Sequence, residues 1–131
     1  MKTSELIGPA LDWAVAKCEG YDLFVVDKNA AYSAYYSPTH GALIYALYST
    51  KWEQGGPIIE REGIAIDCLR TCGQIDGWIA ATEQLMEDTE DEYSVPIEFR
   101  GPTPLIAAMR CYVASKLGDE VNIPKELLGE Q

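Results

Sequence analysis

The tripeptide Gly55–Pro57, near the middle of the chain, restricts the backbone more than any other short stretch. Glycine loses the most conformational entropy on ordering and proline lacks an amide donor, so the tripeptide is unfavourable inside a helix. Ser49 and Thr50 precede it and are residues that commonly cap helices. We therefore expect a short capped helix that includes Trp52, is broken by Gly-Gly-Pro, and delivers the chain into a strand.

Three segments after this corner have the pattern of β-strands. Gly63–Leu69 alternates apolar and polar side chains, and Trp78–Glu83 is the second strand after a hairpin connection over residues 71–77. Val95–Arg100 is the third strand, and Pro96 indicates its start or an edge position. Consecutive strands with short connections predict an antiparallel meander.

Amphipathic helices are expected at both ends of the chain. The first runs from about Ser4 to Cys18, with a kink or its true start at Gly8-Pro9. The last is capped by Thr103, has proline at its first position, and stops at Gly118. Its apolar residues recur at helical spacing, which gives the face that would cover the sheet.

These elements define the expected fold class and domain organisation. The class is α+β: a three-stranded antiparallel meander packed against the N- and C-terminal helices, with a short extra helix before the sheet. The α-β-β-β-α order is like that of the double-stranded-RNA-binding fold. Residues 1–131 are one domain by length, 85–92 an acidic mobile loop, and 119–131 a polar tail. Residues 21–26 suggest a short strand. The tyrosine-rich segment 30–48 either covers the sheet as a loop or lines a pocket.

Charge limits the classes of partner. The chain has 21 acidic and 10 basic residues and a net charge of −11. Direct nucleic-acid binding requires clustered Lys and Arg, so it is not expected. The negative surface either serves solubility or mimics nucleic acid toward a basic protein. No apolar run is long enough for a membrane span, and residues 1–20 lack a signal-peptide core, so we expect a cytoplasmic protein without membrane association.

Motifs for catalysis, metals or cofactors are weak. His40 is the single histidine and lies in a turn, so a nucleophile–histidine pair has little support. The spacing of Cys68 and Cys72 lacks the second pair of a zinc site, and the glycine pair lacks the Gly-Lys-Ser/Thr of a phosphate loop. We expect no catalytic residues, no metal and no cofactor.

The segment around the glycine pair is the candidate ligand- or partner-binding site. Glycine permits close backbone approach, tryptophan offers a stacking plane, and helix-start amides attract anions. The same residues equally describe a structural corner. The candidate residues are Trp13, Tyr48, Ser49, Trp52, Gly55, Gly56, Pro57 and Glu60.

Three blocks of sequence, residues 10–20, 48–63 and 101–119, resemble the NinX-type family of small phage and prophage proteins, a domain of unknown function. The resemblance spans most of the chain. Lys51 departs from it, since the family often has Asp before the tryptophan, and so does the acidic segment 85–92. The resemblance implies a tailed phage or prophage of an enteric bacterium and the host-cell cytoplasm. It implies no known activity.

Two classes of function follow. The first is a non-catalytic binding or interaction module that acts on a host or phage protein, and one version of it is an acidic mimic that inhibits a basic host protein. The second is a small-ligand protein that sequesters a nucleotide-like molecule. A homodimer is also expected to be possible, because a short meander leaves an exposed edge.

Overall fold

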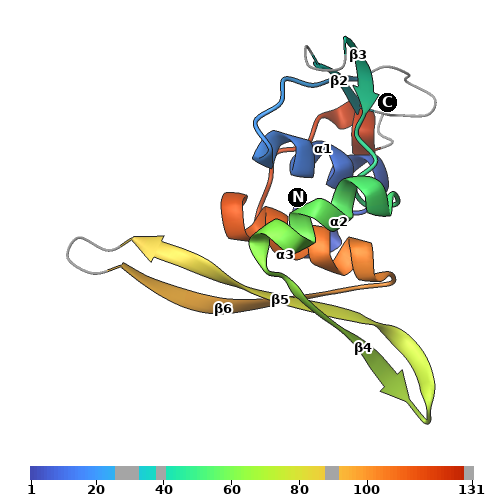
Figure 1. Cartoon of the computed structure of the whole chain (residues 1–131), viewed down its shortest axis with the longest axis vertical. Helices are drawn as coiled ribbons and strands as arrows, with labels where there is room; N and C mark the ends of the chain where they lie inside the picture. The colour runs from blue at the N-terminus through green and yellow to red at the C-terminus, as the bar shows by residue number, and fades with distance from the viewer. Residues whose placement is uncertain (26–32, 38–40, 88–91, 129–131) are drawn as a thin grey trace.

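The computed structural model describes residues 1–25, 33–37, 41–87 and 92–128 (Figure 1). The elements within this part of the chain are two single-turn 3-10 helices, three α-helices and six strands. In chain order they are η1 (Thr3–Glu5), α1 (Gly8–Cys18), β1 (Phe24–Val25), β2 (Ser33–Ser37), β3 (Ala42–Tyr45), α2 (Trp52–Glu62), β4 (Ala65–Thr71), β5 (Gln74–Glu87), β6 (Glu92–Gly101), α3 (Pro104–Leu117) and η2 (Lys125–Leu128).

The centre of the molecule is α3, which begins and ends as the sequence predicts. The Thr103 hydroxyl accepts a hydrogen bond from the Ile106 amide at 3.1 Å, Pro104 opens the helix, and Gly118 ends it with a positive φ of 86°. Buried residues occur on every side of the helix rather than in one stripe. The reason is that α3 lies between the large sheet on one side and α1 and α2 on the other (Figure 1).

Strands β4, β5 and β6 form the predicted antiparallel meander. A two-residue turn, Cys72-Gly73, joins β4 to β5, with positive φ at both residues as the tight hairpin geometry requires. The long β5 pairs with β4 within residues 74–81 and with β6 over residues 78–87, so the outer strands are offset along it. Pro96 lies in β6, an edge strand, as predicted.

The expected position of the N-terminal helix is wrong. The principal helix packed on the meander is α3, and α1 packs against α3 from the opposite side. Leu11 and Val15 of α1 are fully buried in that helix–helix layer. The order of elements also differs, because a second antiparallel sheet, β1-β2-β3, stands between α1 and α2, whereas the short helix expected before the meander is present as α2. The fold class, α+β with a three-stranded sheet on the C-terminal helix, is confirmed.

The predicted break at Gly-Gly-Pro is also wrong. Helix α2 runs without interruption through Gly55, Gly56 and Pro57. Its N-cap is Lys51, with no side-chain cap, so the expected role of Ser49 or Thr50 is not found. Burial of Ile58 against the core holds the helix together despite its poor intrinsic propensity.

Two further segments differ from expectation, and the polar tail is attached to the body by its apolar residues. The tyrosine-rich segment contains the hairpin strands β2 and β3, which pair Ala34 with Tyr45. The expected acidic loop begins too early, since residues 85–87 and 92 belong to β5 and β6 and only 88–91 lie outside the described residues. In the polar tail, Val121 and Leu127 are buried, and the Val121 amide donates to the Met1 carbonyl at 2.9 Å.

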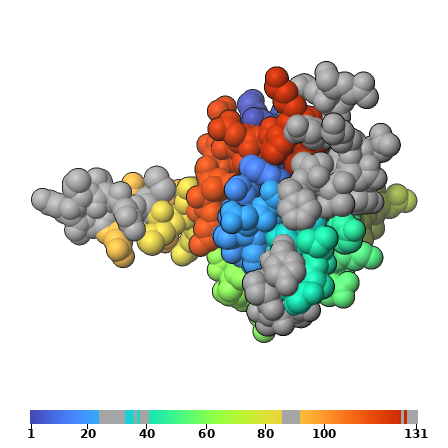
Figure 2. Space-filling model, turned by 90° about the horizontal axis from the view of Figure 1, so that it is seen from above, coloured from blue at the N-terminus to red at the C-terminus, as the bar shows by residue number. Residues whose placement is uncertain are grey.

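The molecule has a helical body and a projecting ribbon. Figure 2 shows the second half of β5 and the first half of β6 extending away from the body. There β5 has no β4 neighbour, so the ribbon is two-stranded.

Candidate functional site

The segment that enters α2 is anchored to α1 by a buried carboxylate. Asp12 is only 4% exposed, and its Oδ1 accepts a hydrogen bond from the Ser49 amide at 2.7 Å. Burial raises the pKa of Asp12 to about 6, although its contacts with Ser49 oppose the shift. Tyr48 and Ser49 are buried beside it, so these two predicted site residues face the core.

Gly55 is the point of closest approach between α2 and its surroundings. A Cβ atom there would lie 2.6 Å from the Tyr48 carbonyl oxygen and 2.6 Å from Leu105 of α3. The backbone of α2 therefore touches its neighbours where any side chain would collide. The close approach foreseen for this glycine exists, but its partners belong to the protein itself.

The other candidate residues lie outside this contact. Trp52 is 54% exposed, and Pro57 and Glu60 are exposed on the same helix. Gly56 is half-buried beneath the Trp52 ring. On α1, Trp13 is half-buried, with the Lys17 ammonium 5.6 Å from its ring centre. The eight predicted residues are thus divided between the core and the surface rather than gathered around one cavity.

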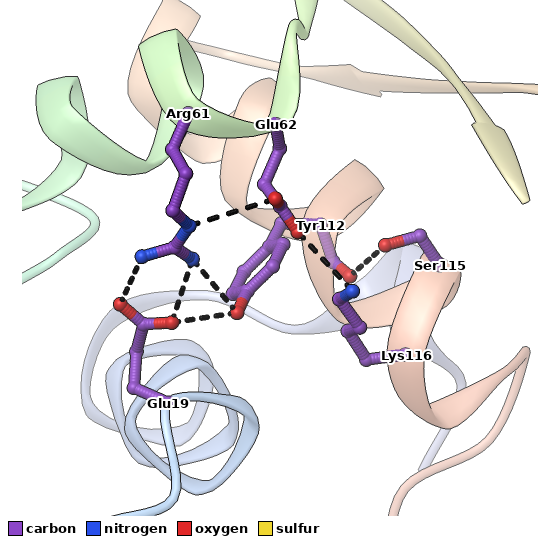
Figure 3. A network of polar contacts seen from close by, with 6 residues as sticks. All are labelled: Glu19, Arg61, Glu62, Tyr112, Ser115 and Lys116. Carbon is purple, nitrogen blue, oxygen red and sulfur yellow. Dashed lines mark hydrogen bonds and ion pairs between the residues drawn. The ribbon is translucent and has the colours of Figure 1, made fainter.

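A polar network joins the C-terminal ends of the three helices (Figure 3). The Arg61 guanidinium donates to both carboxylate oxygens of Glu19, at 3.0 and 2.8 Å, and the Tyr112 hydroxyl donates to Glu19 at 2.6 Å. A second ion pair, Lys116 to Glu62 at 3.2 Å, lies next to it. The two-pronged contact of Arg61 with Glu19 links the C-terminal end of α1 to that of α2.

The network sets the charge state of its members. Burial alone would raise the pKa of Glu19, but the hydrogen bonds from Arg61 and Tyr112 hold that pKa below its ordinary value. Burial, reinforced by the neighbouring Glu19 carboxylate, raises the pKa of the Cys18 thiol to about 12. This cysteine is therefore a neutral thiol at physiological pH and a poor nucleophile. The arrangement stabilises the helices and offers no activated group.

The face of the large sheet that points away from α3 is the second distinctive surface, which we call the outer face. Ala80 of β5 is fully buried toward α3, so its sequence neighbours Ile79 and Ala81 point to the other side. Along the same face the cross-strand register places both apolar and charged residues. They are Asp67, Ile79, Ala81, Glu83, Leu85, Glu92, Ser94, Pro96, Glu98 and Arg100.

This outer face combines apolar area with negative charge. Leu85 is 60% exposed, and Ile79 and Ala81 are half-buried. Among the described residues, no helix or strand covers the side of the large sheet opposite α3 (Figure 1). The carboxylates flank this apolar strip, with Arg100 as its basic member. Sequence reasoning missed the surface, although the alternation in residues 79–85 was the signal that could have revealed it.

Two further findings limit the chemistry of the described residues. Within residues 1–25, 33–37, 41–87 and 92–128, no three His, Cys, Asp or Glu side chains lie close enough to share a metal ion. In the same part of the chain, no helix has the length and hydropathy needed to cross a bilayer.

The fold and these surfaces define an acidic α+β protein. Its central helix, α3, separates a helical layer from a sheet that is covered on one face. The family model described as "Bacteriophage P22, NinX" matches residues 2–116, and the chain belongs to this family. The match confirms the resemblance carried by residues 10–20, 48–63 and 101–119. A comparison with curated proteins gave no match.

Proposed function

We propose that the protein is a non-catalytic interaction module that binds a basic protein partner in the host cell through the outer face of its large sheet. The observation that carries the proposal is the one-sided covering of the sheet. Helix α3 packs on one face, while the other presents half-buried Ile79 and Ala81 and exposed Leu85. Exposed apolar strips with a charged surround are typical of protein-binding surfaces.

Charge selects the class of partner. Among the described residues, Asp67, Glu83, Glu92 and Glu98 share the outer face with one basic residue, Arg100. The whole chain has a net charge of −11, so its field attracts a basic surface and accelerates encounter with it. A phosphate-rich partner is disfavoured by the same field.

Site-specific photo-crosslinking tests the proposal. A photoreactive amino acid at Leu85 in infected cells should capture a defined partner, whereas the same group at exposed Lys51, outside this face, should not. The purified partner should then bind the wild-type protein and lose about tenfold or more in affinity with Glu83→Lys. Equal binding by Glu83→Lys, or the same capture from both positions, would show that the outer face is not the interface.

A further inference from the structure

A hollow of about 520 Å³ opens at the end of the large sheet where β6 turns into α3. The residues that line it include Trp78, Phe99, Arg100 and Arg110, together with Ser4 from η1. This volume lies within the range of small-ligand sites. The hollow contains none of the residues predicted as a binding site.

The hollow follows from the offset of the strands. Strand β6 ends at Gly101, opposite Trp78, while β5 continues back to Gln74 without a neighbour on that side. Gly101 cannot carry a side chain, because a Cβ there would lie 2.6 Å from the Ala107 amide nitrogen of α3. The Trp78 ring therefore remains partly exposed at the end of the sheet.

Arg110 is the unusual residue of this wall. It is half-buried, whereas every other Lys or Arg in the described residues is exposed, and burial lowers its pKa. Its Nε donates to the Leu6 carbonyl and its Nη1 to the Arg100 carbonyl, both at 2.7 Å. No carboxylate of the described residues forms an ion pair with it. In a chain with twice as many acids as bases, a half-buried cation without a counter-ion is a position prepared for an anion.

The charges around the hollow restrict the anion. Asp76 and Glu98 also line it, so acidic residues lie close to Arg110. A ligand with one negative charge gains the hydrogen bonds of Arg110 without strong repulsion from these acids. A multiply charged phosphate would meet repulsion that is only partly screened at these distances.

We propose that this hollow binds a small aromatic carboxylate, with its carboxylate on Arg110 and its ring against Trp78 and Phe99. Arginine presents parallel N–H donors to a carboxylate, and aromatic rings pack favourably in offset or edge-to-face contact. The site is separate from the contacts made by Leu85 and Glu83 on the outer face. Loss of either binding activity leaves the other intact.

Titrations followed by ¹H–¹⁵N NMR test the proposal, with indole-3-acetate as the probe and its uncharged analogue, indole-3-acetamide, as the control. The Trp78 indole N–H and the Arg110 Nε–H signals should shift with indole-3-acetate and give a Kd on the order of 1 mM. The amide should bind about tenfold more weakly, because it lacks the charge-assisted hydrogen bonds. Phenyl phosphate should also bind more weakly than indole-3-acetate.

Variants separate binding from the structural role of Arg110. Arg110→Gln should weaken indole-3-acetate about tenfold or more, and Ser4→Trp should obstruct the hollow while leaving Arg110 and its carbonyl bonds in place. Lys17→Gln removes one positive charge elsewhere and should leave the Kd within about twofold. Equal binding of acetate and acetamide, tighter binding of phenyl phosphate, unchanged binding by Ser4→Trp, or no shift at about 10 mM probe would overturn the proposal.

Discussion

Gly55 and Gly56 are neighbours in sequence with opposite environments. The first meets the Tyr48 carbonyl and Leu105 where a Cβ would stand, and the second has nothing closer than a Trp52 ring atom at 3.8 Å. One glycine is therefore required by packing, while the other only lowers the helix propensity of α2. The sequence shows that the pair is unusual, but it cannot show which member is essential.

Alanine substitutions should separate the two glycines. Gly55→Ala should lower the free energy of unfolding by about 3 kcal/mol, because a backbone oxygen cannot move aside as a flexible side chain can. Gly56→Ala should raise it by about 0.5–1 kcal/mol through helix propensity. Urea denaturation of the two variants measures both values. Similar effects for the pair would contradict the close approach assigned to Gly55.

Asp12 gives the protein a pH dependence opposite in sign to that of Glu19, whose pKa is lowered. Its pKa in the folded state is about 6, above the ordinary value of 3.8, so the folded state binds the proton more tightly than the unfolded state does. The contribution of this group to stability is thus full below about pH 4 and declines as the pH rises through 6. The total loss is about 3 kcal/mol.

Asp12→Asn should remove this loss. The neutral amide oxygen still accepts from the Ser49 amide, so the variant should gain stability relative to wild type as the pH is raised from about 4.5 to 7.5, by up to about 3 kcal/mol. Urea denaturation at several pH values measures the difference, and Asp12→Ala, which lacks the acceptor, is the control. A difference that does not change with pH would rule out the raised pKa.

Among the elements, α3 and α2 mark the limits of prediction. The ends of α3 could be predicted because Thr103, Pro104 and Gly118 act locally on the backbone. The continuity of helix α2 could not be predicted, because it depends on the burial of Ile58 and on the contact of Gly55 with α3. Both are tertiary contacts, which local sequence does not reveal. The meander was predictable from alternation, whereas the face left uncovered depended on where α1 packs.

The three helices are joined at their C-terminal ends by Glu19, Arg61 and Tyr112, and this junction predicts a coupling energy. Tyr112→Phe should cost about 1–2 kcal/mol, because it removes the hydroxyl that donates to the Glu19 carboxylate. A double-mutant cycle with Glu19→Gln should return most of that value as coupling. Lys116→Met, which removes the more exposed ion pair to Glu62, should cost less than about 1 kcal/mol. A coupling near zero would mean that the junction contributes nothing.

On the scale of the whole molecule, net charge opposes compactness. Raising the ionic strength from about 0.01 M to 0.15 M shortens the Debye length from about 30 Å to 8 Å. Repulsion among the 21 acidic residues should then weaken, and Tm should rise by about 2–4 °C. The double variant Glu83→Lys with Glu98→Lys, tested by calorimetry, should show a smaller rise. A Tm that falls with salt would instead indicate that ion pairs dominate.

The position of α3 in the chain has a consequence for synthesis on the ribosome. The first two helices and the sheet are all made before residues 104–117, yet α3 is the element against which they pack. At about 5–20 residues per second, Leu11 and Val15 wait several seconds for their partner after α1 has emerged. The core therefore closes only when α3 leaves the ribosome. A nascent chain stalled before α3 exposes the apolar face of α1 and the apolar face of the large sheet at the same time.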